Sequence, residues 1–565
     1  MEKLLSTIFD AVKKRTTIDA VDTELENAYR TKEGELIVYL SVGNSYTRAF
    51  VTMGRGKTAA EAINEAIESY LEYRVRHLKP ISVKLDVVRE VVPGRKQGSR
   101  LNVKKDEILY RRGEDGFAFS EDLRISFLPE EVEAYKMIQE RHLVKENAFL
   151  AFEKHPLLFD QKAVKTLLTN EFMDVYKVRT HSHYYDKNGY LKLYRGHRFF
   201  DDLNRDDLVN AITLAKNNYF KQAVNSKGKI VYAYQPHNGS QASGYNILRH
   251  AGTTYSMLEV HEMMPDDRLL DAAKRGINFL KKKVEDIEIN GKKAQAVVEK
   301  GAAKLGGNGL AIVCLAKYTE LTGDRQHLEL MQNLATWMGE LQDESGKFAV
   351  HKQKVATGEN TGFISHYYPG EAILAMVRLY KIDGDEKWLD FAENEANYLI
   401  TDRDKTETID TIAHDHWLLY GLNELYRERP KDMYLKHSFF IADAMIHAQR
   451  LDPNEYSREW IGSYKQPGTP RSTPTACRSE GLGAAYRLAM DHGYEDKAAS
   501  YKAGIHEGIK FQLQMQLRPE SVMYYMNKRL CLGAFHAGLK NYELRNDYTQ
   551  HNISSLISYA GILEK

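Results

Sequence analysis

Carboxyl side chains stand at four places in the C-terminal part of the chain where polar residues precede an apolar stretch. They belong to Glu371, Asp415, Glu480 and Asp547, and Tyr548 follows the last of them. Two carboxyl groups that flank a glycosidic bond can act as acid and base, or as acid and nucleophile. A single carboxyl group in such a place is more often a helix cap or half of an ion pair. We therefore take the four carboxyl groups and Tyr548 together as catalytic candidates.

Histidine, arginine and aromatic side chains accompany these carboxyl groups. Arginine presents a planar fork that matches a carboxylate, and a tyrosine or tryptophan combines a flat apolar face with a polar group. Together they predict a cavity for a poly- or oligosaccharide that carries negative charge. The substrate-binding candidates are Arg249, His250, His366, Tyr367, His414, His416, Trp417, Arg478, His536, Arg545 and His551.

Metal binding is the alternative use of the same residues. His414 and His416 could share an ion only where the chain is extended, because residues two apart on a helix point in different directions. Cys477, Cys531 and His536 could form a three-ligand zinc site. The main interpretation assigns no metal ligand and needs no cofactor, and it treats the thiols as buried and inert.

Two alternating helical patterns position these candidates. One is apolar nearly all round after a polar first turn, and it begins near Gly244, Leu305, Ser365, Ile412, Thr475 and Asn546. The other is amphipathic and begins near Asn204, Asp266, Asp324, Asp385, Lys431 and Tyr494. Helix pairs that repeat in this way stack on one another, because no single pair can bury its apolar face. The repeats predict an all-α (α/α)6 toroid over residues 203–565, with an open solenoid as the alternative.

In such a ring the apolar helices form the inner circle, and their polar starts share one rim. The positive ends of the six helix dipoles would then converge on a central cavity and attract anions. The candidate residues lie at these starts, so the fold itself predicts the place of the site.

The N-terminal part follows another pattern. Residues 34–52 alternate around a Gly-Asn-Ser turn and predict a hairpin, a helix follows Thr58, and residues 81–92 predict a strand. Mixed elements of this kind predict an α+β fold for residues 1–165. Residues 166–202, which contain an Asp-Lys-Asn-Gly turn, are expected to connect the two domains through a small hairpin.

Two resemblances add to these patterns. The segments FVT (50–52), EAINEAIESY (61–70), GEDGFAF (113–119) and FLPEEV (127–132) resemble the AMMECR1-like domain family. This resemblance implies a compact mixed domain, to which we assign a possible protein partner.

The segments HYYPGEAILAMVRLY (366–380) and NYELRNDYTQHNISSL (541–556) resemble those of the D-glucuronyl C5-epimerases. That family implies a toroid acting on a polysaccharide that contains uronic acid, with Tyr548 and Glu371 as the acid and base. Epimerisation at C5 removes a proton beside a carboxylate and returns one from the other face. A tyrosine can take part if a cation such as Arg545 or Arg478 lowers its pKa.

We therefore expect a carbohydrate-active enzyme that uses acid–base chemistry on an anionic glycan, as an epimerase, a hydrolase or a lyase. The first alternative is a non-catalytic glycan-binding or scaffold protein of a polysaccharide-synthesis complex. The second is a zinc-dependent toroid resembling the lanthionine cyclases, although their Cys-His-Gly ligand signature is missing.

The composition of the chain excludes several classes of protein. The 565 residues include 79 basic and 78 acidic side chains, which predicts no nucleic-acid groove. Three cysteines cannot make a disulfide framework. No signal peptide and no membrane span are predicted, so we expect a cytoplasmic protein. Tyrosine is abundant, with 35 residues, which suits a cavity for polar ligands.

Overall fold

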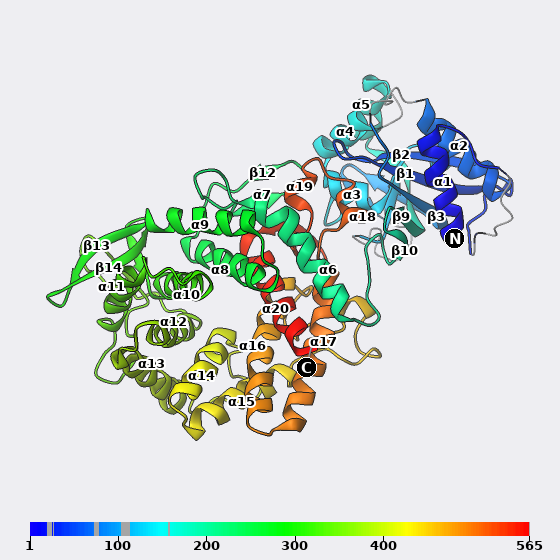
Figure 1. Cartoon of the computed structure of the whole chain (residues 1–565). Helices are drawn as coiled ribbons and strands as arrows, with labels where there is room; N and C mark the ends of the chain where they lie inside the picture. Colours follow the sequence, from blue (N-terminus) through cyan, green and yellow to red (C-terminus); the bar gives the residue numbers. More distant parts are fainter. Residues whose placement is uncertain (20–24, 26, 73–77, 103–112, 156–158, 564–565) are drawn as a thin grey trace. The chain divides into compact units, whose positions relative to one another are not determined.

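The computed structural model describes residues 1–19, 25, 27–72, 78–102, 113–155 and 159–563. The chain forms two compact units (Figure 1). The first unit contains residues 1–199, 235–240 and 517–532, and the second contains residues 200–234, 241–516 and 533–565. None of the described helices is long and apolar enough to cross a membrane.

The first unit is α+β and is built on a ten-stranded sheet. Its longest strands, β3 (Ser82–Gln97) and β9 (Phe172–Asp186), pair antiparallel over most of their length. The expected hairpin is confirmed, because β1 (Leu36–Gly43) pairs with β2 (Phe50–Gly56) and also with β3. The other strands are β4 (Arg100–Asn102), β5 (Gly116–Ala118), β6 (Ser126–Phe127), β7 (Ile138–Gln139), β8 (His142–Leu143) and β10 (Gly189–Leu193).

Two sets of helices bury the apolar side chains of this unit. Apolar residues of α1 (Glu2–Lys14) and α2 (Ala59–Leu71) form one core with β1 and β3. Thr58 and Glu61 make a capping box that starts α2. The second core includes residues of α3 (Pro129–Tyr135), α4 (Lys145–Lys154) and α5 (Gln161–Thr169).

The segment expected to connect the domains carries a central strand of this sheet. Strand β9 lies within residues 166–202, pairs with β3 and β5, and forms the expected hairpin with β10. Residues 517–532 of the same unit contain α18 (Pro519–Val522) and α19 (Lys528–Cys531). Within them, the hydroxyl of Tyr524 lies 2.9 Å from Oγ of Ser41 in β1.

The second unit is an (α/α)6 toroid, as the repeats predict. Its inner helices are α8 (Ile247–Met263), α10 (Leu305–Thr322), α12 (Tyr368–Asp383), α14 (His416–Glu428), α16 (Ser472–Asp491) and α20 (Asn546–Leu563). Each contacts the next, and α20 contacts α8, so the ring is closed and not an open solenoid (Figure 1).

The outer helices are α6 (Arg205–Ala215), α9 (Asp267–Lys281), α11 (Leu328–Gly339), α13 (Glu386–Tyr398), α15 (Asp432–His447) and α17 (Glu495–Leu513). Each packs on an inner helix. Acidic turn residues cap two of them: Asp266 accepts a hydrogen bond from the Leu269 amide in α9, and Asp385 accepts one from the Lys387 amide in α13. Helix α6 continues through a short π-helical turn, residues 216–220, and α7 (Lys221–Ala223).

Short strands interrupt the helical pattern at two places that the sequence analysis does not anticipate. Strands β13 (Val284–Ile289) and β14 (Lys292–Glu299) form a hairpin, and β15 (Ala302–Lys304) and β16 (Lys352–Lys354) extend it. A second small sheet joins β11 (Ala233–Gln235), β12 (Ser240–Gln241), β17 (His536–Gly538) and β18 (Asn541–Arg545). Strand β18 runs directly into α20 and so delivers Arg545 beside the start of the last inner helix.

Candidate active site

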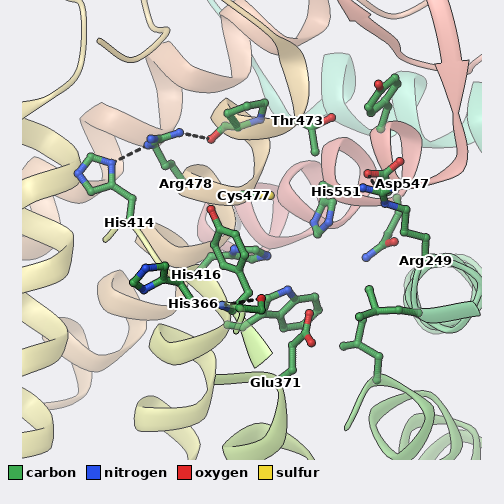
Figure 2. A pocket seen from close by; sticks show the side chains of 18 of the residues that line it. Arg249, His366, Glu371, His414, His416, Thr473, Cys477, Arg478, Asp547 and His551 are labelled. Carbon is green, nitrogen blue, oxygen red and sulfur yellow. Dashed lines mark hydrogen bonds and ion pairs between the residues drawn. The ribbon is translucent and has the colours of Figure 1, made fainter. Parts of the chain in front are cut away.

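A cavity of about 570 Å³ opens in the toroid unit, and all six inner helices contribute to its lining. Most of the predicted residues line it, and Figure 2 shows several of them around one open space. They are Arg249, His366, Tyr367, Glu371, His414, His416, Trp417, Arg478, Arg545, Asp547, Tyr548 and His551. The lining residues cluster in the first turns of the inner helices, where the sequence pattern places them.

Four predicted residues do not line this cavity. His250 is buried, with its ring nitrogens hydrogen-bonded to the Tyr245 hydroxyl and the Gly276 carbonyl, and burial lowers its pKa to about 4. Asp415 caps α14 by accepting a hydrogen bond from the Leu418 amide at 3.1 Å. His536 is also buried, and its Nδ1 lies 3.0 Å from the carbonyl oxygen of Gly538.

Glu480 is the fourth, and it acts through a neighbour that does line the cavity. Its Oε1 lies 2.8 Å from Nδ1 of His551, and its Oε2 lies 3.4 Å from the hydroxyl of Tyr420. Burial raises the pKa of Glu480 to about 7, while the charge and hydrogen bond of His551 act in the opposite direction. Glu480 therefore holds the orientation of His551 and does not itself face the space.

His416 and His551 form a pair of imidazoles at the cavity wall. Their ring centroids lie 5.2 Å apart in an edge-to-face arrangement. His416 is 3% exposed, and neither of its ring nitrogens has a hydrogen-bond partner. Burial, with the positive charges of His551 and Arg478, holds the pKa of His416 well below its usual range. This imidazole is therefore neutral, and both of its ring nitrogens are without a partner among the described residues.

His551 has the opposite character. Burial alone would lower its pKa, but Cys477 and Glu480 raise it well above the usual range through their charges and hydrogen bonds. Burial in turn raises the pKa of the Cys477 thiol, which His551 partly offsets. A neutral imidazole thus stands beside a protonated one.

Glu371 adds a protonated carboxyl group from the first turn of α12. It is buried, and its Oε2 has no hydrogen-bond partner. Burial, with a smaller effect of the Asp415 charge, raises its pKa well above the usual range. Gly306 of α10 makes room for it, because a Cβ at that position would lie 1.9 Å from Oε2 of Glu371.

Arg478 brings a cation that no carboxylate neutralises. Its Nε donates to Nδ1 of His414 at 2.7 Å, and its Nη1 donates to the carbonyl oxygen of Pro474 at 2.8 Å (Figure 2). Its guanidinium also lies over the Tyr464 ring. Burial and the charge of Arg478 lower the pKa of His414 to about 4. Within the described part of the chain, no carboxylate lies within ion-pair distance of Arg478.

Asp547 is neutralised by two arginines. Arg545 donates to both of its carboxylate oxygens, at 2.5 and 2.9 Å, and Nε of Arg249 lies 3.1 Å from Oδ2. The guanidinium of Arg545 also lies over the ring of Tyr548, 4.3 Å from its centroid. This network occupies the acceptor oxygens of Asp547 with guanidinium donors.

Tyr548 does not meet the condition for acid–base work that the sequence analysis states. Its hydroxyl donates to Oε1 of Glu543 at 3.3 Å. Burial raises its pKa to about 12, and the nearby Arg545 charge offsets this only in part. Among the predicted catalytic residues, only Glu371 combines a place at the cavity with a free oxygen.

Aromatic rings and several unpredicted polar groups complete the lining. Tyr367 is half exposed, Trp417 is buried apart from its edge on the cavity, and Tyr368 lies beside them. The lining residues that were not among the catalytic or substrate-binding candidates include Asn246, Arg471, Thr473 and Gln550, and also Cys477, which the sequence analysis considers only as a zinc ligand. Cys477 lies in the second turn of α16 and Gln550 in the second turn of α20, where helical spacing from the polar starts could have found them.

The fold brings together a set of metal-binding side chains that differs from both sets predicted from the sequence. The described residues bring together His416, Cys477, Glu480 and His551, each with one ligand atom within 4.8 Å of the others. This group contains neither His414, Cys531 nor His536, so neither alternative ligand set is the one that the structure assembles.

The fold and the cavity define a closed (α/α)6 toroid with a polar, aromatic-lined central site. No protein-family model matches the chain, and no curated protein matches it significantly. Among solved structures, it is similar to the GH76A alpha-1,6-mannanase from Salegentibacter sp. HEL1_6, with 14% identity and a TM-score of 0.45. That alignment covers 64% of this chain and 99% of the other.

Two further solved structures show the same level of similarity. One is cellobiose 2-epimerase from Spirochaeta thermophila DSM 6192, with 13% identity, a TM-score of 0.47, and coverage of 64% and 97% of the two chains. The other is an unsaturated glucuronyl hydrolase specific for heparin, with 13% identity, a TM-score of 0.45, and coverage of 64% and 99%. At this level the similarity assigns no activity to the present chain.

Proposed function

We propose that the toroid unit is a carbohydrate-active enzyme that removes a proton from the carbon next to the carboxylate of a uronic acid residue in a glycan. The observation that carries this proposal is the neutral His416, which has two unpartnered ring nitrogens and lines the cavity beside the protonated His551. A base without a competing partner, next to an acid, is what proton transfer at carbon requires.

Arg478 supplies the recognition of the substrate in this proposal. Its charge has no carboxylate partner among the described residues, and its side chain faces the cavity. A guanidinium binds a carboxylate with two parallel hydrogen bonds and stabilises the extra negative charge that develops when the neighbouring proton leaves. The half-exposed ring of Tyr367 offers an apolar face to the sugar.

The group that returns a proton decides the product. Return from His551 or Glu371 to the same carbon, on the other face of the sugar, gives C5 epimerisation, the reaction that the resemblance to D-glucuronyl C5-epimerases implies. We assign the base of this reaction to His416 and not to Tyr548, whose pKa is raised to about 12.

Elimination is the second candidate, and the protonated Glu371 is the observation that favours it. A neutral carboxylic acid can protonate the oxygen that leaves from the next carbon after His416 has taken the proton. The product would then be an unsaturated sugar instead of an epimer. Both reactions share the first step.

Hydrolysis receives less support from the same side chains. It needs two carboxyl groups that flank the bond, one of them as base or nucleophile. Of the four predicted carboxyl groups only Glu371 and Asp547 line the cavity, and Asp547 is occupied by Arg249 and Arg545.

Incubation with uronic acid oligosaccharides in heavy water tests the proposal. We expect solvent deuterium at C5, and loss of this exchange by about 10²-fold or more in His416→Gln. His447→Gln, a change at a surface histidine paired with Asp410, is the matched control and should exchange at the normal rate. A chain that binds the oligosaccharides without any exchange would support the glycan-binding alternative. In that case we propose that the first unit binds a protein partner.

A further inference from the structure

Four possible metal ligands converge from three inner helices at the wall of the cavity. His416 comes from α14, Cys477 and Glu480 from α16, and His551 from α20. Their nearest donor atoms all lie within 4.8 Å of one another. Two ligands of a tetrahedral zinc ion lie about 3.5 Å apart, so side-chain movement of about an ångström would bring these atoms to an ion.

His416 gives an independent reason to expect a ligand here. It is 3% exposed, and both of its ring nitrogens lack a hydrogen-bond partner. A buried polar group without a partner costs about 1–3 kcal/mol. A bound ion at one of these nitrogens would remove that cost.

The second contact of His551 matches the outer shell of known metal sites. Histidine ligands usually donate their other ring N–H to a carboxylate, which fixes the ring and increases its basicity. Glu480 holds this place on Nδ1 of His551 at 2.8 Å, and His551 also makes a hydrogen bond with Cys477.

We propose that Cys477, His416 and His551 bind a Zn²⁺ ion, with Glu480 as the outer partner of His551. Thiolate and imidazole are ligands that zinc prefers over magnesium or calcium. Binding releases the thiol proton of Cys477 and one ring proton of His551 to solvent. Cys477, His416 and His551 all line the cavity, so the proposed ion would lie at its wall.

Zinc binding and the proposed proton transfer exclude each other. The ion takes the nitrogen of His416 that would accept the substrate proton, and it takes the nitrogen through which His551 would donate one. Zinc is therefore a reversible inhibitor of the exchange reaction. This second half of the inference rests on the proposed function, whereas zinc binding itself does not.

Cobalt provides the direct probe of binding. The full chain, freed of metal by a chelator, should bind one Co²⁺ per chain and develop a thiolate-to-cobalt charge-transfer band that Zn²⁺ abolishes. Cys477→Ser should lose the band, His416→Gln should weaken binding by about 100-fold, and Glu480→Gln should keep the band with about 10–100-fold weaker binding. Cys314→Ala changes a buried thiol of α10 outside the group and should leave both readouts unchanged. Absence of the band in the unmodified chain would overturn the proposal.

Deuterium exchange with and without zinc separates the two proposals. We expect one equivalent of Zn²⁺ to slow exchange at least about tenfold and a chelator to restore it. Exchange in a chain that binds no metal would refute the zinc site and leave the proposed function standing. Zinc binding by a chain that shows no deuterium exchange when it is free of metal would support the zinc site and refute the proposed function. Faster exchange with zinc would refute mutual exclusion.

Discussion

Nδ1 of His551 lies 2.8 Å from Oε1 of Glu480, which joins the last inner helix of the toroid to its neighbour. The carboxylate fixes which ring nitrogen carries the shared hydrogen and stabilises the positive charge of the imidazolium. His551 also makes a hydrogen bond with Cys477 and lines the cavity. Glu480 is thus a positioning residue, because it acts on the substrate only through His551.

Replacement of Glu480 by glutamine should therefore slow the reaction without changing substrate binding. We expect kcat for C5 exchange to fall by about 10²-fold, with KM unchanged. The alkaline limb of the pH profile should move to lower pH, because Glu480 no longer raises the pKa of His551. Tyr420→Phe, which removes only the 3.4 Å contact on the other oxygen, is the matched control and should lose less than about threefold. Equal losses in the two variants would contradict the role of Glu480.

Replacement of Arg478 should act on binding of the anionic group. We expect Arg478→Met to raise KM for a uronic acid substrate by about 10–10²-fold, since a charged hydrogen bond contributes about 1.5–3 kcal/mol. A substrate whose carboxyl group is esterified provides the control, because the two proteins should bind it equally well. A similar loss with the ester would show that Arg478 has a structural role.

Gly306 and Gly307 form a matched pair that tests the place of Glu371. A Cβ on Gly306 would lie 1.9 Å from Oε2 of Glu371, whereas a Cβ on Gly307 would meet nothing closer than 3.8 Å. We expect Gly306→Ala to displace the carboxyl group and to lower kcat by about 10–10²-fold.

Gly307→Ala should keep full activity, and its melting temperature should not fall, because alanine is preferred over glycine in a helix by about 1 kcal/mol. Equal activity of the two variants would show that the position of Glu371 does not matter for the reaction.

Asp404 gives a prediction for the pH dependence of stability. Burial opposes its ionisation, but Arg403, at 2.6 Å, and His437, at 3.0 Å, lower its pKa to about 2. A carboxyl group with a lowered pKa stabilises the fold fully above its unfolded value of 3.8. That contribution is lost as the pH falls toward about 2.

Asp404→Asn should therefore reduce the free energy of unfolding by about 2 kcal/mol near neutral pH. Urea unfolding of both proteins between about pH 6 and pH 3 should show this difference narrowing as the pH falls. A difference that stays constant with pH would mean that packing, and not charge, stabilises this position.

The sequence by itself indicated the repeated helix pairs and the polar candidates at their starts, whereas the contact of α20 with α8 decided that the ring closes. The apolar run of α10, from Leu310 to Ala316, fits a helix covered on all sides, and the turn residues Asp266 and Asp385 cap the outer helices that follow them. Since these signals are local, the repeats could be counted without coordinates. The polar first turns then had to face one cavity, which is where Arg478 and His551 lie.

Only the tertiary structure decided which of the collected residues can react. The rotation of each helix turns Glu480 and Asp415 away from the cavity, and it brings His416 next to His551 from two inner helices that are not neighbours. Asp547 is neutralised by Arg249, which lies far from it in the sequence. Desolvation and the charge of a neighbour set the protonation of each group. Both depend on contacts between distant segments, and so residue type and spacing could not reveal them.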